Sequence, residues 1–220
     1  TLGLSISTYT GTGNTATVGH GLGVTPSFVI IKVIDTAGSG GYGSFPKFMS
    51  ANYNLYLTGT SGQDAGNAFD TSENSSTVVG LTGSSNATNG VGRGYVMYAF
   101  APSQFISIGS YEGNGNANGA FIPTLNSLGV PIQPVWAITK SIDSTSGWNI
   151  YDKERLGYNP ENAHLVANAT TVESTADDLD IVTGGLKMRI ATDPNVAETY
   201  VYMAIGTPII DVDGRIIAGR

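Results

Sequence analysis

The chain has 220 residues, a formal net charge of −7 and no cysteine. Its ten Lys and Arg are scattered, so a nucleic-acid partner is not expected, and no apolar run reaches the about 20 residues of a membrane span. Without cysteine there are no disulfides, thiolate nucleophiles or cysteine zinc sites. Only 12% of the residues are charged and 30 are glycines, which predicts an uncharged polar surface that suits an extracellular or particle-bound protein.

The first hundred residues predict short β-strands separated by turns. Residues 6–9 alternate between apolar and polar side chains, as a strand with one wet face does. The Gly-rich segment 11–14 tolerates positive φ angles and predicts a turn. Residues 28–31, which follow Pro26, and residues 95–100 are continuous apolar runs. Such runs suit central strands buried on both faces, or a strand whose outer face meets another subunit.

Three blocks of the first half return in the same order in the second half. Residues 4–14 match 106–116, residues 25–32 match 133–140, and residues 95–100 match 200–205. The spacing between the copies changes by only a few residues, which predicts an internal duplication with small loop insertions. Because both copies are rich in short strands and turns, we expect an all-β fold of two tandem jelly-roll-like β-sandwiches, residues 1–102 and 103–207.

The last segment, residues 208–220, lies outside the repeat and predicts a C-terminal hairpin or docking segment. Two apolar runs flank Asp213 and Gly214, a pair that favours a type I′ turn. A lone two-stranded hairpin is barely stable in water. We therefore expect it to pack on the second domain or to pair with another chain. At the other end the chain begins at Thr1 rather than Met, which predicts processing or a longer protein.

Several motifs that could carry chemistry have simpler interpretations. Residues 38–43 fit the glycine pattern of dinucleotide sites, but Pro46 follows where a helix should be established, so we expect a flexible loop. The acidic segments 177–180 and 211–214 lack a complete calcium ligand set. We interpret the first as a solvated loop and the second as a turn.

The two histidines also favour structural roles. His20 lies in a turn between strands, and His164 aligns with Leu55 of the other copy. No Ser lies in a nucleophile-elbow motif. We therefore expect a protein that is not an enzyme, with no catalytic, cofactor-binding or metal-binding residues and no cofactor.

Trp148 and Tyr151 allow two interpretations. Exposed rings could form a platform that stacks on sugars. The alternation of the strand instead places Trp148 and Ile150 on one face, as in a strand that faces a core, and aromatic side chains commonly anchor sandwich cores. The core interpretation is favoured.

The motifs together resemble a repeated β-domain of virion proteins of tailed bacteriophages, above all marine and cyanobacterial phages. The resemblance covers residues 4–206 and rests on segments 9–13 and 18–26, an apolar strand ending at Lys32, and the second-copy segments 109–115, 148–152, 185–189 and 200–204. It implies a location on the virion surface, in a tail fibre, an appendage or a capsid decoration, and no catalytic residues. The polar segment 122–133 is longer than the family pattern, which makes it a candidate contact site.

The leading hypothesis is therefore a non-enzymatic structural and adhesion protein of the virion surface. Its expected partners are other virion proteins and further copies of itself, a trimer being favoured, with a host surface glycan as a further partner. The alternative is a carbohydrate-binding module of a secreted bacterial protein, which requires an exposed aromatic platform. A third hypothesis, a polysaccharide-degrading enzyme, requires two carboxylates about 5 to 10 Å apart in a cleft.

Overall fold

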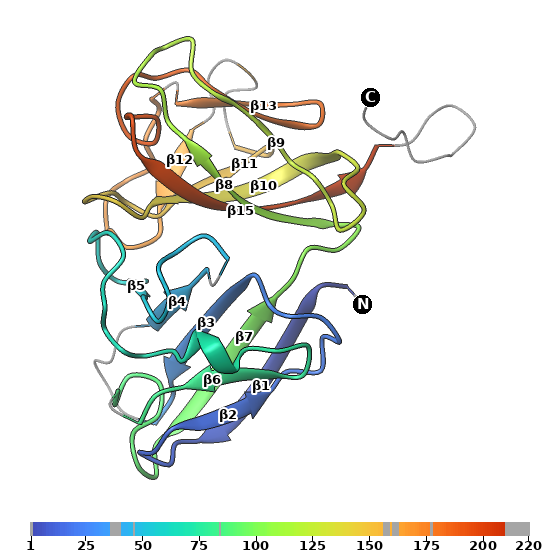
Figure 1. Cartoon of the computed structure of the whole chain (residues 1–220). Coiled ribbons are helices and arrows are strands. Elements are labelled where there is room, and N and C mark those ends of the chain that lie inside the picture. The colour runs from blue at the N-terminus through green and yellow to red at the C-terminus, as the bar shows by residue number, and fades with distance from the viewer. Residues whose placement is uncertain are drawn as a thin grey trace. The chain divides into compact units, whose positions relative to one another are not determined.

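The computed structural model describes residues 2–35, 41–45, 47–83, 85–155, 159, 163–176 and 178–209. Strands dominate this part of the chain, and a 3-10 helix, η1 (Thr71–Glu73), is the helical element among the described residues. The all-β prediction is confirmed. The chain divides into two compact units, Gly3–Ala101 and Pro102–Arg220, with Leu2 grouped with the second (Figure 1).

The first unit consists of two antiparallel sheets that enclose a core. The larger sheet has the strand order β1-β7-β3-β4-β5, so that β1 and β5 are its edges. The smaller sheet pairs β2 with β6, and apolar side chains from both sheets form one buried cluster. The strands are β1 (Leu4–Thr10), β2 (Ala16–Gly19), β3 (Phe28–Val33), β4 (Gly41–Ser44), β5 (Leu55–Tyr56), β6 (Val78–Leu81) and β7 (Gly94–Phe100).

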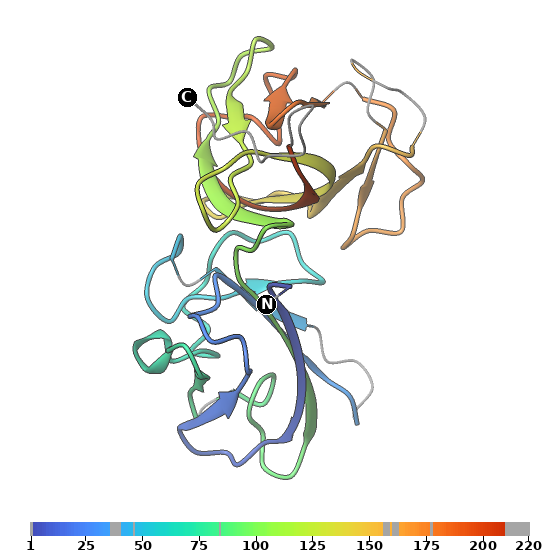
Figure 2. The same cartoon turned by 90° about the vertical axis from the view of Figure 1, so that its right-hand side faces the viewer.

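The second unit also has a five-stranded sheet, in the order β12-β11-β10-β15-β8, and a smaller sheet in the order β13-β14-β9. The pair of β13 and β14 lies over the larger sheet (Figures 1 and 2), and the side chains between them form its core. The strands are β8 (Ile106–Glu112), β9 (Phe121–Pro123), β10 (Ile132–Ser141), β11 (Asn149–Asp152), β12 (His164–Val166), β13 (Leu179–Val182), β14 (Gly185–Met188) and β15 (Thr199–Pro208).

The two larger sheets correspond strand by strand. Written from the other edge, the second order is β8-β15-β10-β11-β12, so the three repeated sequence blocks occupy the same three places in each sheet. The register corresponds too, because Tyr9 lies opposite Tyr95 and Tyr111 lies opposite Tyr200. These tyrosines stack in both units, with ring centroids 5.1 and 5.0 Å apart. The correspondence supports an internal duplication, and the common origin of the units stays a prediction.

The register corrects one sequence alignment. His164 lies opposite Tyr151, one residue away from the pair of Leu165 and Ile150. When β3 and β10 are matched at the repeat, Gly43 of β4 corresponds to Ile150 of β11. In the first unit Leu55 lies opposite Gly43, so Leu55 corresponds to Leu165. His164 therefore corresponds to Asn54 rather than to Leu55. Both are buried polar residues at an isolated β-bridge, Asn54 to Asp64 and His164 to Ser174.

Other predictions on loops and on the chain end have mixed outcomes. Gly13 and Gly115 have φ angles of 71° and 61°, so the turns predicted after the first strand of each copy are confirmed. The predicted flexible loop at 38–43 is wrong for residues 41–43, because Gly41–Ser44 form β4, and residues 38–40 lie outside the described residues. Of the predicted C-terminal hairpin, Pro208 ends β15 and residues 210–220 lie outside the described residues.

Candidate functional site

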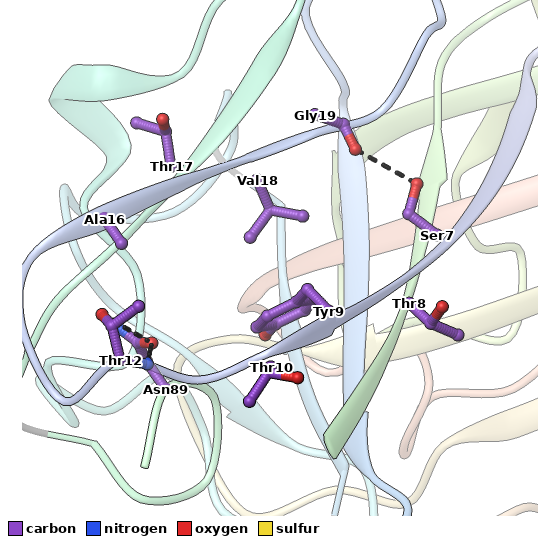
Figure 3. A pocket seen from close by; sticks show the side chains of 10 residues that line it. All are labelled: Ser7, Thr8, Tyr9, Thr10, Thr12, Ala16, Thr17, Val18, Gly19 and Asn89. Atoms are coloured by element: carbon purple, nitrogen blue, oxygen red, sulfur yellow. Dashed lines mark hydrogen bonds between the residues drawn. The ribbon is translucent and has the colours of Figure 1, made fainter. Parts of the chain in front are cut away.

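A groove opens on the flank of the first unit, between edge strand β1 of one sheet and edge strand β2 of the other. It consists of two adjoining hollows of about 280 and 580 Å³ that share Ser7 and Gly19. We call it the flank groove. Figure 3 shows the smaller hollow, with Tyr9 and Val18 facing each other across it. The lining residues are Ser7, Thr8, Tyr9, Thr10, Thr12, Ala16, Thr17, Val18, Gly19 and Asn89 in the smaller hollow, and Ser7, Gly19, His20, Gly21, Gly23, Ser76 and Thr77 in the larger.

Tyr9 is the aromatic side chain of the flank groove, and its position is fixed. One face of its ring stacks on Tyr95, and its hydroxyl donates to the carbonyl of Thr88 at 2.5 Å. Burial, and then the proximity of Tyr95, raise the pKa of Tyr9. The hydroxyl therefore stays protonated at physiological pH, and the half-buried ring presents an uncharged surface to the groove.

Hydroxyl and amide groups and the imidazole of His20 make up the rest of the polar lining. The Ser7 hydroxyl donates to the carbonyl of Gly19 at 3.1 Å and thereby separates the two hollows (Figure 3). At the far end Asn89 accepts from the backbone N–H of Thr12 at 2.8 Å. His20 accepts at Nδ1 from the N–H of Leu22, and its Nε2 lies 3.2 Å from the carbonyl of Ser75, which fits the neutral tautomer protonated at Nε2.

None of the described residues that line the flank groove is Asp, Glu, Lys or Arg. Transferring a charged ligand group from water into such a lining is costly, because no opposite charge compensates its lost hydration. Uncharged hydroxyl and amide groups of a ligand can instead exchange their water hydrogen bonds for bonds to the lining. The groove is therefore suited to a neutral polar ligand.

The acidic segment of the second unit is not the solvated loop that the sequence predicted. Asp178 and Asp180 have 3% and 2% of their surface exposed. Arg189 donates through Nε to Asp180 at 2.5 Å. His164 Nδ1 lies 2.9 Å from Oδ2 of Asp178. The prediction failed because the partners of these two carboxylates, Arg189 and His164, come from other segments of the chain. Asp177 and residues 211–214 lie outside the described residues.

A buried polar cluster of Tyr151, His164 and Asp178 results, which the sequence reasoning missed. The Tyr151 hydroxyl donates to Asp178 Oδ2 at 3.2 Å, and the Tyr151 ring lies 5.3 Å from that of His164. The cluster ties strands β11 and β12 to the segment before β13. In the described part of the chain, no group of three His, Cys, Asp or Glu side chains is arranged to hold a metal ion.

The core interpretation of Trp148 and Tyr151 is confirmed, since 1% and 0% of their surfaces are exposed. The expected shared face of Trp148 and Ile150 is wrong, because in β11 it is Asn149 and Tyr151 that are buried and Ile150 is half-exposed. These two rings therefore cannot form the sugar platform that the alternative hypothesis required.

The candidate contact segment 122–133 contains an ordered turn. The side chain of Asn126 accepts from the N–H groups of Leu128 and Val130 at 2.9 and 3.0 Å. The hydroxyl of Thr124 is buried and donates to the carbonyl of Ile132. The exposed Leu128 stands at the tip, where a partner could contact it.

Lys140 of β10 makes the stability of the second unit depend on pH. Its side chain is buried, and its Nζ donates to the carbonyl of Ser141 at 2.7 Å. Burial lowers the pKa of Lys140 from 10.5 to about 8, while Asp193 and Glu198 oppose this shift. Between these two values the unfolded chain binds more protons than the folded chain, so stability rises with pH.

We expect the unfolding free energy of the second unit to rise by about 1–2 kcal/mol between pH 7.5 and 9.5. Above pH 10 the trend reverses, because burial raises the pKa of Tyr111 and Tyr151 and these side chains ionise more easily in the unfolded chain. Denaturant unfolding followed by tryptophan fluorescence measures this, since Trp136 and Trp148 both belong to the second unit. The Lys140→Met variant should have a flat profile from pH 7.5 to 9.5, and an unchanged slope in this variant would contradict the assignment.

Comparisons with known proteins define the family of the chain. Among the described residues, no helix has both the length and the apolar character needed to cross a membrane. No curated protein and no solved structure matches the chain. One family model, described as a domain of unknown function (DUF7483), matches residues 1–207. The chain therefore belongs to the DUF7483 family.

Proposed function

We propose that this chain is a non-enzymatic structural and adhesion module of a tailed-phage virion surface, in which the first unit binds a neutral glycan of the host surface. The flank groove carries the proposal, because it offers hydroxyl, amide and aromatic groups without a charged side chain. The sequence resemblance to phage virion domains and the low share of charged residues support the location.

A glycan fits this lining better than an ionic or a wholly apolar ligand does. Sugar hydroxyls can bond to the hydroxyls of Ser7 and Thr12, and the apolar face of a sugar ring can pack on Tyr9 or Val18. Small-molecule sites occupy about 300–1,000 Å³; the smaller hollow, of about 280 Å³, lies just below this range and the larger, of about 580 Å³, lies within it. One or a few sugar residues would fill them.

Self-assembly is the second part of the proposal, and the outer face of the larger sheet in the first unit supports it. Leu4 and Ile6 project from β1 with 43% and 58% of their surfaces exposed. They lie opposite Phe100 and Tyr98 of β7, which are half-exposed. Exposed apolar side chains beside a free strand edge favour association, and a second copy of the chain is the proposed occupant.

The test is a binding measurement with the purified chain and a panel of neutral oligosaccharides, read by calorimetry. We expect binding to one member of the panel that changes little between about 50 and 500 mM salt, because no charge pair is formed. Ser7→Trp should weaken it at least tenfold by filling the groove, while Ser110→Trp, at an exposed position of β8, should leave it unchanged.

The smaller change Ser7→Ala provides a second groove variant should Ser7→Trp disturb the fold, and circular dichroism checks the fold of each. Absence of binding to every member, or equal binding by wild type and both groove variants, would contradict the glycan site. Light scattering on the same samples tests the assembly, and a monomer at every concentration would contradict self-association in solution.

A further inference from the structure

One pair of positions differs between the two units at the place where the flank groove opens. In the first unit Ser7 of β1 lies opposite Met97 of β7. In the second unit the corresponding strands place Gly109 opposite Tyr202. The next pairs on the same face of the sheet are conserved between the units, Ser5 with Ala99 as Ser107 with Ala204, and Tyr9 with Tyr95 as Tyr111 with Tyr200.

Tyr202 fills the flank of the second unit. Its hydroxyl donates to the carbonyl of Pro123 at 3.0 Å and lies 3.2 Å from the hydroxyl of Ser107. A Cβ atom at Gly109 would lie 2.7 Å from Cε1 of Tyr202, so the glycine makes room for the ring. Only 5% of the surface of Tyr202 is exposed, and the ring joins the core.

The carbonyl that Tyr202 reaches corresponds to the one that Ser7 reaches in the first unit. Strand β9 occupies the place of β2, because each is the second strand of its unit and pairs within the smaller sheet. The fully buried Leu186 and Met188 of β14 match Val79 and Leu81 of β6, so Ile122, opposite Leu186, matches Val18, opposite Val79. Pro123 therefore corresponds to Gly19. In the second unit the bond to this carbonyl comes from Tyr202, a long side chain of the inner strand β15. In the first unit it comes from Ser7, a short side chain of the edge strand β1.

The first unit keeps the space that the tyrosine fills in the second. Met97 is fully buried in the core of the first unit. The short Ser7 side chain leaves a hollow on either side of its bond to Gly19. Val18 is only partly buried there, whereas Ile122 at the corresponding position is 2% exposed.

We infer that ligand binding is confined to the first unit, and that the pair Ser7–Met97 keeps its flank groove open while Gly109–Tyr202 closes the second. The second unit is then a closed copy that serves as scaffold. The ligand part of this inference rests on the proposed glycan function, while the open and closed states of the two flanks do not.

A cysteine-free chain allows a test that needs no ligand. Val18→Cys and Ile122→Cys introduce one thiol each at corresponding places, and a bulky maleimide reports their access. We expect Val18→Cys to react at least tenfold faster. Adding Ser7→Gly with Met97→Tyr should slow Val18→Cys at least tenfold, and adding Gly109→Ser with Tyr202→Met should accelerate Ile122→Cys by a similar factor. Equal rates in the two units, or rates that ignore these exchanges, would overturn the inference.

The same Ser7→Gly and Met97→Tyr exchange, without the cysteine, should abolish oligosaccharide binding while the thermal unfolding midpoint stays close to that of wild type. Tyr202→Phe, which keeps the ring and removes the hydroxyl bonds, should leave binding unchanged. Full binding after the exchange would overturn the assignment of the ligand to this groove. A wild-type chain that binds no neutral glycan would instead contradict the proposed function, and the thiol rates would still decide which flank is open.

Discussion

Replacing Asn195 with Ala should lower the unfolding free energy of the second unit by about 3 kcal/mol, because three hydrogen bonds made by one buried side chain are lost at once. Asn195 is fully buried, and its amide donates to the carbonyls of Asn116 and Ile190 at 2.9 and 2.6 Å. Its side-chain oxygen accepts from the N–H of Asn114 at 3.2 Å. Alanine removes all three of these bonds, which join the turn after β8 to the segment after β14.

The first unit offers an independent copy of the same experiment. Asn89 donates to the carbonyls of Asn14 and Thr82 and accepts from the N–H of Thr12, so it secures the turn after β1 as Asn195 secures the turn after β8. Asn89→Ala should destabilise the first unit by a similar amount. Because the turn at Thr12 and Asn89 ends the flank groove, the same change should also weaken ligand binding.

Denaturant unfolding measures both effects, with tryptophan fluorescence for the second unit and far-ultraviolet circular dichroism for the whole chain. Asn118→Ala is the control, since Asn118 lies exposed in the same loop as Asn116. It should change the free energy of unfolding by less than about 0.5 kcal/mol. A cost below about 1 kcal/mol for Asn195→Ala would contradict a structural role for this amide network.

The sequence predicts the three strands of each unit that lie in the repeated blocks, because their signals are local. Alternation at residues 6–9 and the apolar runs at 28–31 and 95–100 lie within β1, β3 and β7, the three strands that build the centre and one edge of the larger sheet. The glycine turns follow from backbone freedom alone. Strand β4 was missed because Gly41 and Gly43 lack the side chains on which a pattern depends; its strand form comes from pairing with β3 and β5.

The flank groove could not be predicted, because its walls meet only after folding. Tyr9 and Thr88, whose hydrogen bond fixes the ring, are 79 residues apart in sequence, and Ser7 and Gly19 belong to different sheets. The repeat did contain a usable signal. Aligning the two copies places Met97 against Tyr202 and Ser7 against Gly109, a joint change of one large and one small residue at facing positions. Such a pair indicates that one copy fills a space that the other leaves open.

The acidic segment 177–180 shows why composition misled the prediction. Asp residues in a polar stretch favour a solvated loop, unless their charge is compensated by partners that only the tertiary fold supplies. Here the carboxylate of Asp180 accepts a hydrogen bond from Arg189. The carboxylate of Asp178 accepts one from Tyr151 and lies next to His164, so both carboxylates are buried at β13. Their burial makes the cluster a sensitive part of the second unit.

Removing either side chain of the His164–Asp178 contact should cost about 2 kcal/mol of unfolding free energy, because the remaining buried polar group loses a partner that lies 2.9 Å away. Asp178→Ala and His164→Ala combined should cost at least about 1 kcal/mol less than the sum of the single changes, since they remove one shared interaction. Tyr151→Phe, which removes only the hydroxyl bond to Asp178, should cost about 1 kcal/mol. Tryptophan fluorescence during denaturant unfolding measures all four variants.

Glu154→Ala is the control, because its pair with Lys153 is solvent-exposed and should contribute less than about 0.5 kcal/mol. Additive single costs would mean that His164 and Asp178 are buried independently, and the bridge between His164 and Ser174 would then have to hold β12 in place without the carboxylate.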